Sequence, residues 1–325
     1  MTASRAPAAV LVTGASGFVG RAVCRALAVA GAPVRGLGRH PATGPWASFH
    51  PCDLASEAPP PDALAGVDVV IHLAARTHAV DDDPGDETAY RALNVDGTRR
   101  LIDAARTAGV RRLVLASSVK AMGEGGPRCL TEDDPPCPTS AYGRTKLEAE
   151  GLVLGAGLEA VVVRLPLVYG PGAKGNLERM QRAVAAGLFP AVAAANRRSL
   201  VHVDDAAEAL ALAGRHPAAS GRVYLVTDGA PYSTLDIHRA MCAAVGRRPP
   251  RLVLPRWPFA LVARLGDALG AVLGRRLPLD SVALDKLLGS ACYDSARIGR
   301  ELGFRPRHRL PRGLVEGGEP AGVPR

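Results

Sequence analysis

Residues 8–20 read Ala8-Ala9-Val10-Leu11-Val12-Thr13-Gly14-Ala15-Ser16-Gly17-Phe18-Val19-Gly20, an apolar run that ends in a glycine-rich turn. A helical pattern follows over residues 21–30. This order predicts a strand, a tight turn and a helix. Glycines in such a turn let the backbone approach a pyrophosphate, and the next helix offers N–H donors and the positive end of its dipole. The stretch therefore predicts a dinucleotide-binding unit in an α/β fold.

A second string, Tyr142-Gly143-Arg144-Thr145-Lys146, places a phenol and an ammonium group four residues apart. Side chains at this spacing lie on the same face of a helix. A cation beside a phenol favours the phenolate and lowers its pKa, so Tyr142 is the candidate general acid/base and Lys146 its partner. Taken alone, the string could be an incidental pair on a surface helix. Together with a dinucleotide site it predicts hydride-transfer chemistry.

Apolar runs alternate with helical patterns through the first half of the chain. Strands are expected at residues 10–13, 34–38, 67–74, 112–117 and 160–164, and helices at residues 21–30, 88–108 and 142–154. Strands separated by helices predict a doubly wound parallel sheet, the Rossmann arrangement. The pattern becomes irregular after about residue 170. We expect three parts: a Rossmann domain over residues 8–170, a smaller C-terminal α/β substrate domain over residues 171–313 with some crossing back, and a flexible tail over residues 314–325.

Five motifs occur in a fixed order: the turn at residues 13–20, His72-Leu73-Ala74-Ala75, Asn94-Val95-Asp96-Gly97-Thr98, Ser117-Ser118, and the Tyr142–Lys146 string. In this order they resemble the extended short-chain dehydrogenase/reductase superfamily, and more narrowly the NAD-dependent epimerase/dehydratase family of nucleotide-sugar enzymes. The resemblance runs from about Val10 to about Leu310. It implies a catalytic set of Ser118, Tyr142, Lys146 and Asn94.

The resemblance implies a role for each member of this set. Ser118 would hydrogen-bond the substrate carbonyl or hydroxyl, and the family spacing favours it over Ser117. Lys146 would also bond the nicotinamide ribose. Asn94 would order the proton path from the lysine, although a polar residue at a helix start is an equal alternative.

The choice of cofactor depends on the end of the second strand. An NAD-specific site carries an acidic residue there, which bonds the ribose 2′-hydroxyl. Gly38 stands at this position and leaves space for a 2′-phosphate. Arg39 follows and supplies the positive charge that would bind it. NADP(H) is therefore the expected cofactor, with NAD(H) the alternative if Arg39 is a solvated loop residue. The expected cofactor-binding residues are Gly14, Ser16, Gly17, Phe18, Val19, Gly20, Arg39, Asp53, Leu54, Leu73, Ala74, Ala75, Tyr142 and Lys146.

On the substrate side, Asn176-Leu177 and Arg198 match positions that hold the nucleotide diphosphate in nucleotide-sugar epimerases. An arginine there can fork onto pyrophosphate oxygens; surface polar groups are the alternative. With Ser118 and Tyr142 these residues form the expected substrate-binding set. Leu167 departs from the family, where an asparagine often contacts the sugar nucleotide.

The resemblance favours a UDP-sugar as the small-molecule substrate, with chemistry at the sugar C4. Family dehydratases carry an acidic pair where this chain has Val119-Lys120, so dehydration is disfavoured. Reduction of a UDP-4-keto-6-deoxy-(N-acetyl)hexosamine for surface-polysaccharide precursors is the preferred function. A UDP-sugar 4-epimerase similar to UDP-glucose 4-epimerase is the alternative, and a non-catalytic NADPH-binding sensor is a remote one.

Composition sets the remaining bounds. The 325 residues are 47% hydrophobic and 22% charged, as in a globular protein, and the net charge of +9 is scattered rather than blocked, so no nucleic acid is expected as a partner. The composition does not decide between a monomer and a homodimer. No signal pattern opens the chain, which predicts a cytoplasmic location.

Cysteine spacing and the apolar segment at residues 252–275 give two further expectations. No Cys-x-x-Cys pair or His-Cys metal spacing occurs, so we expect free thiols and no metal site. Arg256, Arg264 and Asp267 interrupt the apolar segment, which is too broken to span a membrane. A packed helix is expected there, without stable membrane insertion; an interfacial membrane helix is the lesser alternative.

Overall fold

The computed structural model describes residues 9–77, 87–126, 128–173, 176–273 and 280–315. Its main element is a seven-stranded sheet in the order β3-β2-β1-β4-β5-β6-β9, and all neighbouring strands in it are parallel. The strands are β1 (Ala9–Thr13), β2 (Val34–Gly38), β3 (Ser48–Pro51), β4 (Val67–His72), β5 (Arg112–Ser118), β6 (Glu159–Leu165) and β9 (Arg222–Leu225). The predicted doubly wound fold is confirmed.

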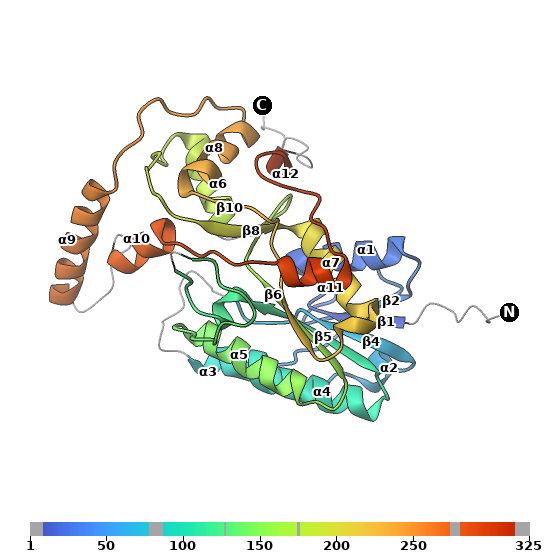
Figure 1. The fold of residues 1–325 in the computed structure, drawn as a ribbon. Coiled ribbons are helices and arrows are strands. Elements are labelled where there is room, and N and C mark those ends of the chain that lie inside the picture. Colours follow the sequence, from blue (N-terminus) through green and yellow to red (C-terminus); the bar gives the residue numbers. More distant parts are fainter. Residues whose placement is uncertain (1–8, 78–86, 127, 174–175, 274–279, 316–325) are drawn as a thin grey trace.

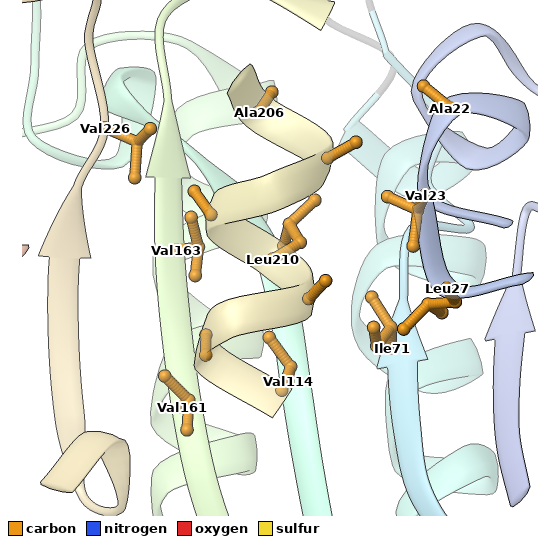
Figure 2. Close-up of a cluster of buried hydrophobic side chains, with 14 of the residues drawn as sticks. Ala22, Val23, Leu27, Ile71, Val114, Val161, Val163, Ala206, Leu210 and Val226 are labelled. Carbon is orange, nitrogen blue, oxygen red and sulfur yellow. The ribbon is translucent and has the colours of Figure 1, made fainter. Parts of the chain in front are cut away.

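Helices cover both faces of this sheet (Figure 1). On one face lie α2 (Pro61–Leu64), α4 (Thr98–Thr107) and α5 (Ala141–Leu154), and on the other α1 (Phe18–Val29), α7 (Val203–Arg215) and α11 (Ala296–Leu302). Figure 2 shows Ala206 and Leu210 of α7 against Val163 and Val114 of the central strands. Burying a side chain such as Leu210 stabilises the fold by about 1.5–3 kcal/mol, so α7 is part of the main core although it follows residue 171.

The helix expected over residues 88–108 is broken in the structure. It consists of α3 (Glu87–Arg91), a π-helical turn η1 (Ala92–Gly97) and α4. Gly97 lets this turn approach the main chain, because a Cβ there would lie 2.9 Å from the carbonyl oxygen of Leu54. Such π-turns insert an extra residue into a helix and re-aim its side chains. This turn carries Asn94, one of the predicted catalytic residues.

A second sheet builds the smaller lobe, in the order β10-β8-β7. Its strands are β7 (Leu167–Tyr169), β8 (Arg198–His202) and β10 (Pro231–Tyr232), and the lobe also contains α6 (Asn176–Ala186), α8 (Thr234–Ala244) and α12 (Arg312–Val315). Two short 3-10 turns, η2 (Val119–Ala121) and η3 (Pro217–Ala219), complete the main lobe. The predicted tail falls mostly in residues 316–325, outside the described residues.

The apolar segment at residues 252–275 forms the helix α9 (Trp257–Leu273), which packs against α10 (Ser281–Leu288) at the rim of the molecule (Figure 1). Within the described part of the chain, no helix combines the length and apolarity needed to cross a membrane.

The expectation that all six cysteines are free thiols is wrong. Cys129 and Cys292 form a disulfide, while Cys24, Cys52, Cys137 and Cys242 are free. The two chain segments run side by side, with the Leu130 amide donating to the Cys292 carbonyl at 2.9 Å. A separation of 163 residues hid this pairing from spacing rules, which detect only nearby cysteines.

Candidate active site

The turn between β1 and α1 is packed so closely that it requires glycine. Gly14 has φ +67°, and a Cβ on it would lie 2.8 Å from the Ala74 amide nitrogen. A Cβ on Gly20 would lie 2.2 Å from the carbonyl oxygen of Gly14. Gly17 caps α1 without a side chain, so the first turn of the helix presents backbone N–H groups. This geometry fits a dinucleotide pyrophosphate, because a backbone cradle and a helix N-terminus both favour an anion.

Other predicted cofactor residues surround this turn. Ser16 is exposed beside Gly38, whose Cβ position lies 3.4 Å from the Ser16 hydroxyl oxygen. Arg39 follows at the surface. Phe18 and Val19 pack partly against the core.

Further members follow β4 and β3, which lie on either side of β1 and β2 in the sheet. Leu73, Ala74 and Ala75 follow β4 and are half-buried. Asp53 accepts a hydrogen bond from the Ala55 amide at 3.1 Å and so closes its own turn. Leu54 is 2% exposed and belongs to the core, so its side chain supports the fold there rather than contacting a cofactor.

A chain of hydrogen bonds fixes the position of β4 beside β1 and the start of α4. Thr98 donates its only hydroxyl proton to the Asn94 carbonyl at 2.7 Å, so the His72 Nε2–H must donate to Thr98 at 3.0 Å. His72 Nδ1 then accepts from Thr13 at 2.7 Å. Burial, together with the positive charge of Lys146, lowers the pKa of His72 to about 3. His72 is therefore neutral, and its two ring nitrogens link Thr13 of β1 to Thr98 at the start of α4.

The predicted acid/base pair meets at the carboxyl end of β5. Ser118 ends this strand, and its side chain hydrogen-bonds Tyr142 near the start of α5. Ser140 caps the helix by accepting from the Gly143 amide at 3.1 Å. Gly143 permits the close approach of α5, since a Cβ would lie 2.4 Å from the Lys120 carbonyl oxygen. The carboxyl edge of a parallel sheet is where catalytic groups gather in such folds.

The charge states at this edge differ from the simple expectation. Burial raises the pKa of Tyr142, and the bond to Ser118 opposes that shift in part. Lys146 is buried and donates from Nζ to the Ala116 carbonyl at 2.8 Å. Burial lowers the pKa of Lys146 to about 8, against the opposing effect of Glu150. The expected lowering of the tyrosine pKa is therefore not observed, because burial outweighs it.

Sequence reasoning missed a buried ion pair beneath the site. The Ser117 hydroxyl donates to Glu150 at 2.5 Å, and Arg164 of β6 forms a bidentate pair with the same carboxylate. This pair occupies Ser117 and leaves Ser118 as the serine that meets Tyr142. The available signal was spacing, because Tyr142, Lys146 and Glu150 recur every four residues on one helix face.

Asn94 lies behind the lysine rather than against it. The Asn94 side-chain amide forms two hydrogen bonds with the backbone of Arg76. Its Oδ1 accepts from the Arg76 N–H at 2.8 Å, and its Nδ2 donates to the Arg76 carbonyl at 3.1 Å. Its Nδ2 also donates to Thr145 at 3.2 Å. Asn94 thus ties the segment after β4 to α5, one residue from Lys146.

Apart from Ser118 and Tyr142, the predicted substrate residues lie in the smaller lobe. Arg198 on β8 is half-buried, and its guanidinium donates to the Gly289 carbonyl at 3.0 Å. Burial lowers the pKa of Arg198, while the negative charge of Glu124 raises it. Leu177 is buried in the core of the lobe. Asn176 begins α6, and its side chain lies outside the described residues.

Lys120, at a position where dehydratases carry an acid, forms an ion pair with Glu124. Glu124 also accepts from Thr139 at 3.5 Å. This carboxylate therefore lies between the loop after Ser118 and Arg198, and both positive side chains balance it. Sequence reasoning did not identify Glu124 as a residue of the site.

One group of possible metal ligands lies away from this edge. Ligand atoms of His202, Asp204 and His308 fall within 4.8 Å of one another. The two imidazole rings stack with centroids 4.1 Å apart, and His308 Nδ1 lies 3.1 Å from Asp205. Stacked, nearly parallel rings support packing of the C-terminal segment on α7.

The fold and this site define the extended short-chain dehydrogenase/reductase class. A model of the NAD dependent epimerase/dehydratase family matches residues 10–227. The chain belongs to this family, and it is an NAD(P)-dependent enzyme of the epimerase/reductase type.

Known relatives span both chemistries. The chain is 31% identical to a UDP-glucose 4-epimerase from Vibrio cholerae, over 95% of this chain and 94% of that protein. It is 32% identical to a ceramide reductase from Caulobacter vibrioides, over 82% and 80%. The solved structure of MoeE5 in complex with UDP-glucose and NAD has a TM-score of 0.74 and is 28% identical, covering 94% of this chain and 96% of that one.

Proposed function

We propose that this enzyme reduces the C4 ketone of a UDP-4-keto-6-deoxy sugar, of the N-acetylhexosamine type, with NADPH. The observation that supports it most is the Ser118–Tyr142 hydrogen bond at the end of β5, with the buried Lys146 one turn further along α5. A nicotinamide dinucleotide, when bound, supplies the hydride. Reduction of a ketone also requires a proton for its oxygen, and this is the part that the chain provides.

The residues at the site can perform that proton transfer. Ser118 holds the carbonyl oxygen by a hydrogen bond, and the Tyr142 hydroxyl gives up its proton to that oxygen. The tyrosine is left as a phenolate, which the positive charge of Lys146 stabilises. Asn94 fixes the segment beside Lys146. Arg198 would hold the substrate diphosphate, because a guanidinium forks onto phosphate oxygens.

The preference for NADPH rests on the end of β2. Gly38 lies against Ser16 without a side chain, and Arg39 is exposed directly after it. An acidic residue for the ribose 2′-hydroxyl of NAD is missing at this strand end. Arg39 offers charge to a 2′-phosphate instead.

A UDP-sugar 4-epimerase is the second candidate. Its support is the relative from Vibrio cholerae, which matches this chain over nearly its full length. An epimerase returns its hydride to the same sugar and so consumes no cofactor, whereas a reductase consumes one NADPH for each ketone.

The experiment follows NADPH absorbance with a UDP-4-keto-6-deoxy-N-acetylhexosamine, and product formation with UDP-glucose and no added cofactor. We expect stoichiometric NADPH consumption, and a kcat/KM preference for NADPH over NADH that falls at least about 10-fold in Arg39→Ala. Copurified NAD with rapid conversion of UDP-glucose to UDP-galactose would instead establish the epimerase.

A further inference from the structure

Helix α9 presents its large apolar side chains outward. Trp257 is 68% exposed, Leu265 62% and Leu261 55%. Val262 and Leu269 are also exposed, and the five residues recur along one side of the helix over about 18 Å. We call them the α9 stripe. A packed surface helix shows the opposite pattern, with its large apolar residues facing the core.

The inner side of α9 carries Phe259, which is half-buried, and otherwise small residues. Ala263 is 3% exposed, and Ala260 and Gly266 are half-buried. Asp267 faces α10, where its carboxylate accepts hydrogen bonds from the Ser281 amide at 3.0 Å and from the Ser281 hydroxyl at 2.5 Å. The contacts within the protein are therefore made by the inner side. Figure 1 shows α9 at the rim of the molecule with α10 on its inner side, which leaves the stripe accessible.

Arginines are frequent in the sequence on both sides of the stripe. The sequence from residue 247 to residue 276 contains seven arginines and one aspartate. Among them, Arg251, Arg256 and Arg264 are exposed. Arg256 directly precedes Trp257 and forms an ion pair with Asp285 of α10 at 3.2 Å, and Arg264 lies between the stripe residues Leu261 and Leu265 in sequence. Asp267 points away from the stripe toward α10, so Arg264 is the arginine within the stripe segment.

We propose that the α9 stripe docks on the surface of an anionic phospholipid bilayer, with the helix lying in the interface plane. Apolar side chains enter the headgroup and acyl boundary, tryptophan prefers this depth, and arginines bind lipid phosphates. A second copy of this chain fits less well, because two-fold pairing of the stripes would bring the two exposed Arg264 side chains, near the middle of each helix, close together. The inference does not depend on which ketone or sugar the active site takes.

The test uses full-length Trp46→Phe protein, in which Trp257 is the single tryptophan. It is mixed with phosphatidylcholine vesicles, with or without about a quarter of phosphatidylglycerol. We expect cosedimentation and a blue shift of Trp257 emission with the anionic vesicles, and at least about 10-fold weaker partitioning on neutral ones. Partitioning onto neither kind of vesicle would overturn the proposal.

Two triple variants separate the stripe from general surface apolarity. Leu261→Ser/Leu265→Ser/Leu269→Ser should weaken binding to anionic vesicles at least about 10-fold. The control Val29→Ser/Leu154→Ser/Leu188→Ser changes three exposed apolar residues elsewhere and should bind like the parent protein. Equal loss in both triples would contradict a specific stripe.

A charge variant covers the case in which the stripe triple fails to fold. Arg251→Gln/Arg264→Gln keeps the stripe intact and should reduce binding to anionic vesicles several-fold, about 5-fold or more, without affecting the neutral ones. Sedimentation velocity without lipid tests the competing occupant. If the stripe triple converts a dimer into a monomer there, a second copy covers the stripe and the lipid proposal is wrong.

Discussion

Ser117 and Ser118 are adjacent on β5, yet α5 gives their hydroxyls different partners. Ser117 donates to the buried Glu150 carboxylate, whereas Ser118 bonds Tyr142. Because the Ser117 hydroxyl already donates its proton to a buried carboxylate, it is a poor hydrogen-bond donor to a substrate. The division of roles therefore follows from the four-residue repeat of polar side chains on the inner face of α5.

Replacing Tyr142 with Phe tests the proton donor. The ring and its tilted contact with Tyr90, with centroids 6.1 Å apart, are retained, and only the hydroxyl is lost. We expect kcat to fall at least about 100-fold, because general acid/base groups contribute that much or more. Dinucleotide affinity, measured by fluorescence titration, should change little. Turnover close to that of the wild type would contradict the assignment.

The lowered pKa of Lys146 predicts that dinucleotide binding depends on pH. Its pKa is lowered to about 8 by burial, so the ammonium charge is present below that pH and is lost as pH rises through it. We expect the dissociation constant of the dinucleotide to increase between about pH 7 and about pH 9. Lys146→Arg keeps its charge over this range and should bind with little pH dependence. A wild-type dissociation constant that is flat over the same range would show that the ammonium charge is not used.

Sequence identified the residues that belong to compact local motifs. The glycine turn and the Tyr142–Lys146 pair were recognisable because their spacing reflects one turn or one helix face, whereas Ser118 was chosen from the family resemblance. Arg164 and Glu124 were not predicted, since each depends on contacts between separate elements, and the spacing signal for Glu150 did not reveal its partners. The direction of the pKa shift of Tyr142 was also predicted wrongly. Burial raises this pKa, and burial cannot be read from residue spacing.

At the scale of elements, strand positions were predicted closely because buried parallel strands are short, continuous apolar runs. The helix over residues 88–108 was predicted as one piece, since its apolar periodicity does not distinguish an α-turn from a π-turn. The π-helical turn η1 forms where His72 and Thr98 tie the helix to β4. Such a tertiary hydrogen-bond chain cannot be read from local periodicity.

Gly20 and Gly151 are helical glycines with opposite surroundings. In α1, a Cβ on Gly20 would lie 2.2 Å from the carbonyl oxygen of Gly14. In α5, a Cβ on Gly151 meets no atom within 4 Å. Gly20→Ala should destabilise the protein by about 1–3 kcal/mol through overpacking and weaken dinucleotide binding at least about 10-fold, because the cradle must shift.

The matched control is Gly151→Ala, which should stabilise by about 0.5–1 kcal/mol, since alanine loses less backbone entropy in a helix. Thermal melting and dinucleotide titration check both variants. If the two alanine variants melt and bind alike, the close approach of Gly20 to Gly14 has no energetic consequence.

At the scale of the whole molecule, the two lobes are connected through several chain crossings. The chain leaves the main sheet after β6, builds part of the smaller lobe, and returns through α7 and β9. The segments around Cys129 and Cys292 add a further link, because Leu130 and Tyr293 form an isolated parallel bridge and the Tyr293 hydroxyl donates to the Gly123 carbonyl at 2.8 Å. The sequence led us to expect some crossing back within residues 171–313, but residue order did not indicate which segments cross.

The disulfide between Cys129 and Cys292 joins the loop after Ser118 to the segment beside β8. In oxidised, denatured protein we expect four titratable thiols, those of Cys24, Cys52, Cys137 and Cys242, and six after reduction. Cys129→Ser/Cys292→Ser should lower the free energy of unfolding by about 2–4 kcal/mol, because the cross-link restricts the unfolded chain.

Cys137→Ser is the control for this pair, because Cys137 is exposed and free. Its melting temperature should stay within error of the wild type, since surface substitutions usually change stability by less than about 0.5 kcal/mol. A reducing agent should lower the melting temperature of the wild type and leave that of the double-serine variant unchanged. Six reactive thiols in protein that was never reduced would show that the bridge does not form, and the link between the lobes would then rest on the Leu130–Tyr293 bridge and the hydrogen bonds around it.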